Sequence, residues 1–194
     1  MYIHTGSERE STTSISSTSS ISSTSSTAHP RRNNKPKGFS HTDAHGRARM
    51  VDVGAKPATS RWARAEGVVR VGRAIAAALR KTGAVAKGNV LETARLAGIQ
   101  AAKQTPSLIP LCHPLALDVV DVDARVVGNE VRIAAHVACE AKTGVEMEAL
   151  TAVAVAALTV YDMCKSASKA MEIGPIRLVE KGGGKSGLWS RKRP

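Results

Sequence analysis

The sequence predicts an α+β fold in which helices cover one face of an antiparallel sheet. Residues 117–137 alternate between apolar and polar around Gly128-Asn129, a pattern typical of a β-hairpin with one wet face. Two other stretches, 90–103 and 148–161, repeat apolar residues at helical spacing. The chain is 42% hydrophobic but only 3% aromatic, so its core must consist of Ala, Val, Leu and Ile. Strands and helices mixed in this way indicate α+β rather than a doubly wound α/β fold.

The first elements are short. Met50–Val53 is predicted as a strand that ends at Lys56-Pro57. The stretch from Arg61 to Val71 mixes Ala, Arg and Val and fits either a strand or a helix. Arg73–Lys81 is predicted as a helix that ends at Gly83, because glycine commonly terminates helices.

A second helix is predicted over Val90–Lys103, where apolar residues recur at helical spacing. The turn Lys87-Gly88-Asn89 precedes it, and Asn89 is a residue type that caps helix N-termini.

The segment Leu108–Leu115, LIPLCHPL, has two prolines that flank Cys112-His113. Proline disfavours a helix, so we expect a stiff extended segment that presents a thiol and an imidazole. A zinc site would need two further ligands, and no second Cys or His pair has ligand spacing. A Cys112 nucleophile would need a base, and its neighbour His113 points the other way on an extended chain. A substrate-binding imidazole held rigid by Pro114 and a purely structural proline corner stay open as alternatives.

The stretch from Lys142 to Lys169 organises the chain. Glu146 and Glu148 precede about a dozen uncharged residues, and Asp162 and Lys165 follow them. The spacing predicts a buried helix from about Glu148, too short and too closely flanked by charge to span a bilayer. Asp162 and Lys165, at i and i+3, can touch, whereas Glu148 and Asp162 lie roughly 20 Å apart along one helix axis. Acids at the start of a helix and lysines at its end also suit the helix dipole without any catalytic role.

The end of the domain is predicted as one strand and a basic segment. Gly174-Pro175 interrupts the chain, and Ile176–Val179 is the last predicted strand. The following KGGGKSG, Lys181–Gly187, is not a P-loop, because Val179 stands where that motif needs glycine and too few residues follow for its helix. We expect a flexible basic segment that can close over an anion.

Four lysines stand at predicted element boundaries or turns, where a lysine can reach a phosphate. They are Lys56, Lys87, Lys165 and Lys181. A lysine crowded by other cations also has a lowered pKa and can act as an acid or base near neutral pH.

The chain of 194 residues carries a formal charge of +12, which favours anionic partners. Nucleic acid is one candidate, but the chain has only one Phe, two Tyr and two Trp to stack on bases. A small phosphorylated substrate fits at least as well. Three cysteines without a CxxC pair predict a reducing compartment. The sequence has no run of 18 or more apolar residues, so it predicts no membrane-spanning segment.

The first 38 residues are predicted to be a disordered leader with a basic linker. Residues 11–27 are Ser or Thr at 15 of 17 positions, so they cannot bury a core. We expect the ordered domain at 39–188 and a basic tail at 189–194. The expected compartment is the cytoplasm. If the Ser-rich leader is a transit segment, the mitochondrial matrix is the alternative, although Glu8 and Glu10 count against it.

Several stretches together resemble the MoaC family, the cyclic pyranopterin monophosphate synthases of molybdenum cofactor biosynthesis. The carrying segments are MVDVGAK (50–56), ARLAGIQAAK (94–103), LIPLCHPL (108–115), KTGVEMEALTAVAVAALTVYDMCK (142–165) and IGPIRLVEKGGGKSG (173–187). The likeness covers about residues 39–188, with 61–85 only loosely matched. Asn89 stands where the family often has Asp, and both residues cap helices.

The resemblance implies a ferredoxin-like subunit and a homohexamer, built as a trimer of dimers with active sites at the dimer interface. It implies the conversion of 3′,8-cyclo-7,8-dihydroguanosine 5′-triphosphate to cyclic pyranopterin monophosphate, with release of pyrophosphate, by a lyase. It implies no resident cofactor, although Mg²⁺ can accompany the triphosphate.

The resemblance also implies site residues. Asp162, Lys165 and Lys87 match catalytic positions of the family. The matching substrate-contacting positions are Leu111, Cys112, His113, Glu146, Met147, Glu148, Lys56, Arg61 and Lys181.

Two other function classes remain as alternatives. One is a basic RNA-binding domain, for which binding would depend steeply on salt. The other is a scaffold whose Ser/Thr-rich leader recruits partners, for which deletion of residues 1–38 would abolish function.

Overall fold

The structure is a computed structural model that describes residues 45–192. The predicted leader, residues 1–38, lies outside the described residues.

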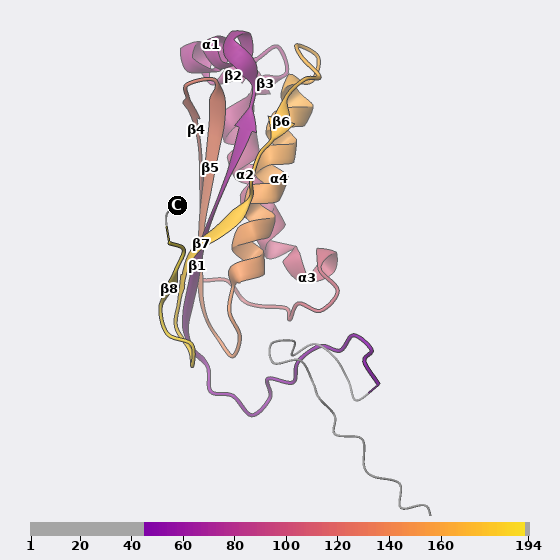
Figure 1. Cartoon of the computed structure of the whole chain (residues 1–194), viewed down its shortest axis with the longest axis vertical. Helices are drawn as coiled ribbons and strands as arrows, with labels where there is room; N and C mark the ends of the chain where they lie inside the picture. The colour runs from indigo at the N-terminus through magenta and orange to yellow at the C-terminus, as the bar shows by residue number, and fades with distance from the viewer. Residues whose placement is uncertain (1–44, 193–194) are drawn as a thin grey trace, which may run out of the picture. The chain divides into compact units, whose positions relative to one another are not determined.

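The described part contains a six-stranded sheet, a two-stranded hairpin and four helices (Figure 1). The strands are β1 (Thr59–Arg70), β2 (Ala84–Val85), β3 (Gly88–Asn89), β4 (Val119–Val127), β5 (Glu130–Ala141), β6 (Glu172–Ile173), β7 (Arg177–Gly182) and β8 (Trp189–Ser190). The helices are α1 (Gly72–Thr82), α2 (Val90–Lys103), α3 (Thr105–Leu108) and α4 (Glu146–Cys164).

The large sheet has the strand order β4-β5-β1-β7-β8, with β6 paired to β1, and all its pairings are antiparallel. Without the short elements, the chain runs β1-α2-β4-β5-α4-β7. This βαββαβ succession, with the fourth strand beside the first and the third beside the second, is the ferredoxin-like arrangement. The predicted α+β class is confirmed.

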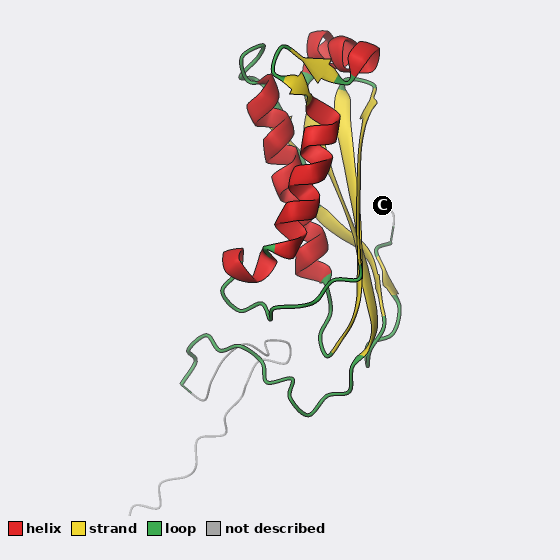
Figure 2. Ribbon diagram, turned by 180° about the vertical axis from the view of Figure 1, so that it is seen from behind, coloured by secondary structure: helices red, strands yellow, loops and turns green. Residues whose placement is uncertain are grey.

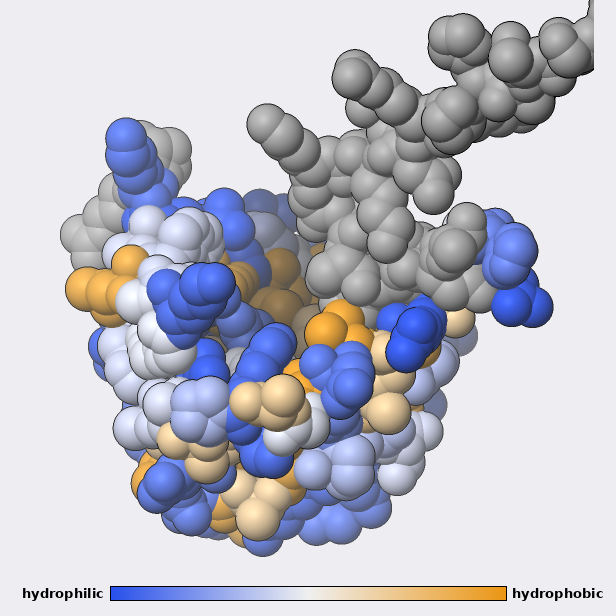
Figure 3. All heavy atoms as spheres, turned by 90° about the horizontal axis from the view of Figure 1, so that it is seen from below, coloured by the Kyte–Doolittle hydropathy of each residue, from blue (hydrophilic) through white to orange (hydrophobic). Residues whose placement is uncertain are grey.

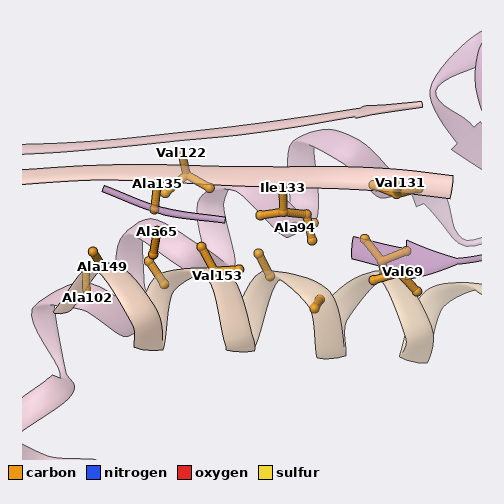
Figure 4. Close-up of a cluster of buried hydrophobic side chains, with 14 of the residues drawn as sticks. Ala65, Val69, Ala94, Ala102, Val122, Val131, Ile133, Ala135, Ala149 and Val153 are labelled. Carbon is orange, nitrogen blue, oxygen red and sulfur yellow. The ribbon is translucent and has the colours of Figure 1, made fainter. Parts of the chain in front are cut away.

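Helices α2 and α4 lie side by side on one face of the sheet (Figure 2). The core between the layers consists of small aliphatic side chains, as the composition predicts. Figure 4 shows Ala65 and Val69 of β1 and Ile133 of β5 turned toward Ala149 and Val153 of α4. All five are at most 3% exposed. With few large side chains available, the helices must approach the sheet closely to exclude water.

The predicted hairpin is confirmed as β4 and β5, which pair antiparallel around Gly128-Asn129. Val122 and Ile133 point into the core, whereas Asp123 and Arg132 are exposed on the opposite face. The alternation in sequence thus sets which face of the sheet the helices cover.

The ends of α1 and α2 follow the predicted signals. Gly83, at φ 68°, caps the C-terminus of α1 in the left-handed region that favours glycine. The Asn89 side chain accepts a hydrogen bond from the Glu92 backbone N–H at 3.0 Å and caps α2.

Residues 61–70, which the sequence left as either a strand or a helix, belong to strand β1. The predicted strand Met50–Val53 is wrong. Residues 50–53 have no regular secondary structure, and β1 starts only after Pro57. Within the described chain, none of the strand pairings of the sheet includes residues 50–53.

Helix α4 starts at Glu146, two residues before the predicted start, and runs for 19 residues. By length and composition it could cross a membrane, contrary to the expectation that it is too short. In this fold 56% of its most apolar window is buried, as is typical of a core helix. Close packing against α2 depends on Gly98, where an added Cβ would lie 2.9 Å from the Ala152 carbonyl oxygen.

Candidate active site

Helix α4 carries predicted site residues at both of its ends. Its N-terminus lies at the lower end of the sheet in Figure 1, and its C-terminus lies near the β2–β3 hairpin. Glu148 and Asp162 are therefore separated by roughly 20 Å along the axis, as the sequence predicts.

The first feature at the N-terminal end is a cavity of about 700 Å³, here called the basic pocket. Five cationic side chains line it: Lys56, Arg61, Lys142, Lys181 and Lys185. Viewed from below, this end of the molecule is largely hydrophilic around a hollow with hydrophobic surface inside it (Figure 3). A pocket with this charge suits a polyanion such as a triphosphate.

Residues 182–184 form one wall of the basic pocket. Gly183 and Gly184 have φ angles of 94° and 64°, which favour glycine. A Cβ at Gly183 would overlap the Ser60 carbonyl oxygen, and one at Gly184 would overlap the Arg61 guanidinium. The glycines thus let this segment lie directly against β1. Of the predicted basic segment Lys181–Gly187, the first two residues end β7, Gly183 and Gly184 pack against β1, and residues 185–187 are exposed.

The second feature is a cavity of about 360 Å³, here called the His113 pocket. The segment after α3 contributes Leu111, Cys112 and His113, and the first turn of α4 contributes Met147 and Glu148. The prediction that 108–115 is extended throughout is wrong, because Leu108 ends α3 and the Cys112 N–H donates to the Ile109 carbonyl oxygen at 3.0 Å in a turn. Lys56, Thr143, Gly144 and Glu146 line both pockets, so the two cavities adjoin. Together they offer a cationic chamber beside a chamber with a thiol, an imidazole and carboxyl groups.

Glu146 and Lys181 connect the walls of the basic pocket. The Lys181 Nζ donates to Glu146 Oε1 at 2.6 Å, and both side chains are about one-third exposed or less. The charge of each group is thus largely matched by the other in this structure. A substrate that binds Glu146 or Lys181 must compete with this ion pair.

Glu148 is buried, with 3% of its surface exposed. Burial raises the pKa of its carboxyl group, and the charge of Glu146 raises it further. Within residues 45–192, no cation forms an ion pair with it. Glu148 is therefore a carboxyl group whose ionised form is less favourable than that of a solvent-exposed glutamate.

Burial also raises the pKa of the Cys112 thiol, and the nearby Glu148 charge acts in the same direction. A thiolate is the reactive form of cysteine, so this surrounding disfavours a nucleophilic role for Cys112. No three His, Cys, Asp or Glu side chains in the described part are grouped so that they could hold a metal ion.

The C-terminal end of α4 carries the Asp162 cluster, which consists of Lys87, Asp162 and Lys165. The Lys165 Nζ lies 2.6 Å from Asp162 Oδ1, so the predicted i, i+3 contact is made. The Lys87 Nζ, from the turn between β2 and β3, lies 3.9 Å from Asp162 Oδ2 and donates to the Asp162 carbonyl oxygen at 3.2 Å. All three side chains are about half exposed.

The charges of the Asp162 cluster shift the pKa values of its members. The hydrogen bond from Lys165 lowers the pKa of Asp162, and the charges of Lys165 and Lys87 lower it further. Asp162 in turn raises the pKa of Lys165. This is opposite to the lowered pKa expected for a lysine crowded by cations, because the carboxylate is the closest charge.

The structure therefore sorts the predicted site into two groups. The nine predicted substrate-binding residues line the two adjoining pockets: Lys56, Arg61, Leu111, Cys112, His113, Glu146, Met147, Glu148 and Lys181. The three predicted catalytic residues form the Asp162 cluster, at the other end of α4. A single copy of the chain does not bring the two groups together.

A model of the MoaC family matches residues 50–184. The chain belongs to the MoaC family. A protein of Roseiflexus sp. named cyclic pyranopterin monophosphate synthase is 59% identical over 151 residues, which cover 77% of this chain and 95% of that protein. A protein of the same name from Novosphingobium aromaticivorans is 55% identical over 151 residues, 78% of this chain and 96% of its own length. The Drosophila melanogaster protein named molybdenum cofactor biosynthesis protein 1 is 54% identical over 149 residues, 76% of this chain and 26% of that protein.

The region that matches the MoaC family includes both groups of predicted site residues, from Lys56 to Lys181. Trp62 and Lys142 are among the lining residues of the basic pocket that were not predicted from the sequence. Lys142 stands two residues before Gly144, at the boundary between β5 and α4, so the boundary criterion applied to the other lysines would have found it. Trp62 lies on a strand whose type stayed open in the sequence, so its position could not be assigned.

Proposed function

We propose that this chain converts 3′,8-cyclo-7,8-dihydroguanosine 5′-triphosphate to cyclic pyranopterin monophosphate and releases pyrophosphate. This reaction is an early step of molybdenum cofactor biosynthesis. The observation that carries the proposal is the pair of adjoining pockets. One is lined by five cations and the other by an imidazole and two carboxyl groups, all within a MoaC-family fold.

The basic pocket holds the triphosphate. Forming a cyclic monophosphate requires a substrate oxygen to attack the α-phosphorus, while the bond to the bridging oxygen of the leaving pyrophosphate breaks. The pyrophosphate takes that electron pair, so negative charge develops on it. Lys56, Arg61 and Lys181 are placed to stabilise this charge.

The His113 pocket holds the purine-derived part of the substrate. Glu146 accepts hydrogen bonds from the guanidine-like edge of the base, where a carboxylate matches two N–H donors. It can do so once Lys181 turns from Glu146 to the phosphates. Cys112 and His113 face the same cavity, with Leu111 and Met147 as apolar walls.

Asp162 and Lys165 form the acid–base pair for the proton transfers that rebuild the guanine ring system, and Lys87 assists ring opening. The two groups are in direct contact at 2.6 Å, so one substrate group can reach both of them. Because Asp162 raises the pKa of Lys165, the lysine is protonated in this pair and gives up its proton more readily once the substrate separates it from the carboxylate.

The two groups of residues meet between subunits. A second copy places its Asp162 cluster over the pockets of the first, in a homohexamer built as a trimer of dimers. The separation of roughly 20 Å along α4 supports this, since one chain cannot close the site. The proposal needs no resident cofactor, Mg²⁺ accompanies the triphosphate, and the compartment is the cytoplasm.

A coupled assay tests the proposed function. The 3′,8-cyclised GTP derivative is supplied to the purified protein, and pyrophosphate release and the fluorescent oxidised pterin are followed together. Both signals are expected, and both should disappear in Lys87→Ala and Asp162→Ala.

The other outcomes of the assay are equally informative. Pyrophosphate without pterin would indicate simple triphosphate cleavage and contradict the ring-rebuilding reaction. If a correctly folded oligomer gave neither pyrophosphate nor pterin, the proposal would be overturned.

A further inference from the structure

The segment 51–57 forms a wall of both pockets although it belongs to neither the sheet nor the helices. Val51 and Val53 line the His113 pocket, Pro57 lines the basic pocket, and Lys56 lines both. Residues 51–58 have no regular secondary structure. Something other than a strand ladder must therefore hold this wall in place.

Two hydrogen bonds within the segment shape it locally. The Gly54 N–H donates to Asp52 Oδ1 at 2.8 Å, and the Lys56 N–H donates to the Val53 carbonyl oxygen at 3.1 Å. Both bonds join residues only two or three positions apart. They can form the turn, but they cannot attach it to the rest of the fold.

Lys142 supplies the attachment. Its Nζ donates to the Gly54 carbonyl oxygen at 2.7 Å, across 88 positions of sequence. Lys142 follows directly after β5 and stands four residues before the first residue of α4, so its backbone is fixed by the sheet and the helix. The bond is charge-assisted and solvent-exposed, and it joins the segment to the core at its turn.

The five cations of the basic pocket differ in what they contact. Lys181 pairs with Glu146, and the Arg61 Nε donates to the Ala141 carbonyl oxygen at 3.4 Å. Lys56 and Lys185 form no ion pair within residues 45–192. Among these five, only the Lys142 ammonium donates to the backbone of residues 51–57 within the described chain. Through this hydrogen bond, Lys142 can hold the segment that carries Lys56 at the junction of the two pockets.

We infer that Lys142 is a positioning residue of the substrate site. By bonding to the Gly54 carbonyl oxygen, it holds the segment 51–57 as a pre-formed wall and presents Lys56 to the phosphates. A pre-formed wall lowers the ordering cost of binding, so loss of Lys142 weakens anion binding beyond the loss of one charge. The inference depends on the proposed function only for the identity of the anion.

The test combines two measurements on the full-length protein that do not require turnover. One is the affinity for inorganic tripolyphosphate by titration calorimetry. The other is amide hydrogen exchange of peptides covering residues 50–58, which reports whether the segment opens. The variants are Lys142→Met, Lys142→Arg, Lys185→Met and Lys56→Met.

Lys142→Met is expected to speed exchange in residues 50–58 and to weaken tripolyphosphate binding about tenfold. Lys142→Arg should retain much of the slow exchange in residues 50–58 and much of the tripolyphosphate affinity, because arginine also donates to a carbonyl. Lys185→Met is the matched control, since it removes one cation of the same pocket without touching the segment. It should weaken binding only about threefold and leave exchange unchanged. Lys56→Met should weaken binding without changing exchange.

Three results would overturn the inference. Weaker binding in Lys142→Met with unchanged exchange would make Lys142 a direct phosphate contact. Faster exchange with unchanged affinity would show that the wall does not serve the site. No change in either would remove any role for the hydrogen bond. A protein that shows the expected shifts but does not convert the cyclised GTP derivative would contradict the proposed function and leave the positioning role intact.

Discussion

Glu148 is a buried carboxyl group, and its ionisation inside the fold costs stability. It is buried at 3% exposure, and its raised pKa results from burial and from the charge of Glu146. A carboxyl group that loses water without gaining a cation is less stable when ionised. Glu148 lies in the first turn of α4 and lines the His113 pocket, where a carboxyl group with a raised pKa can serve as a proton donor.

Glu148→Gln should therefore stabilise the protein at neutral and mildly alkaline pH. The folded carboxyl has a pKa above its ordinary value of 4.5, so the folded state binds more protons between the two values. Stability consequently falls as pH rises through that window, and the amide removes this loss. We expect a gain of about 1 kcal/mol at about pH 8 in urea unfolding. The gain should shrink as the pH approaches 4.5.

Glu92→Gln provides a control of opposite sign. Glu92 has a lowered pKa because of its hydrogen bond from Arg95, so its substitution should remove stability near neutral pH. If Glu148→Gln were less stable than the parent at about pH 8, Glu148 would be an ionised group with a favourable partner.

Asp162 and Lys165, at the C-terminal end of α4, are single residues whose replacement should affect turnover. Lys165→Met and Asp162→Asn should each lower kcat by about 100-fold to 10,000-fold, the range for loss of a general acid or base. Tripolyphosphate affinity should change little, because the basic pocket is formed by other residues. Steady-state kinetics with the cyclised GTP derivative measures this.

Lys103→Met is the matched control for Lys165→Met, since Lys103 is an exposed lysine at the end of α2. It should retain near-normal turnover. Near-normal turnover in Lys165→Met as well would remove the acid–base assignment.

At the scale of elements, the contact between α2 and α4 sets the position of both halves of the site. The helices meet through small residues, and Gly98 faces Ala152 and Ala156. A Cβ at Gly98 would lie 2.9 Å from the Ala152 carbonyl oxygen and 3.1 Å from Val122 Cγ1. Any side chain at this position must push α2 away from α4 or from the sheet.

Gly98→Val should destabilise the fold by about 2 kcal/mol through overpacking. Gln100→Val on the exposed face of the same helix should cost only about 0.5 kcal/mol, the intrinsic penalty of a β-branched residue. Urea unfolding at matched protein concentration compares the two. Helix propensity alone would make Gly98→Val slightly stabilising, because valine is a better helix former than glycine. A loss no larger than that of Gln100→Val would therefore contradict overpacking at position 98.

Elements with strong local signals were predicted well from the sequence. Asn89 and Gly83 mark helix ends because their side chain and backbone conformation act within a few residues. Gly128-Asn129 and the alternation around it fix the hairpin for the same reason. Met50–Val53 was predicted wrongly because an apolar run contains no information on whether a partner strand is available. The two-residue strands β6 and β8 were not predicted, since they form only through pairing with β1 and β7.

At the scale of the whole molecule, the predicted site residues form two separate groups on one chain. The fold brings segments from residue 51 to residue 186 into two adjoining pockets, which the sequence order alone does not show. It keeps the Asp162 cluster at the far end of α4, as helix geometry requires. The resemblance gave the identities of these residues, whereas their division into two groups follows from the α4 axis and is plain in the structure.

The most direct test of the account is activity in mixed oligomers of two inactive variants. Lys181→Ala removes a residue of the basic pocket, and Lys165→Ala removes a residue of the Asp162 cluster. If each site takes one half from each of two copies, unfolding and refolding the variants together should restore about a quarter of the normal turnover, because random pairing leaves one intact site in half of the dimers. A mixture of Lys87→Ala with Lys165→Ala, which share one half-site, should stay inactive. No recovery in the first mixture, from correctly assembled oligomers, would contradict a site shared between copies.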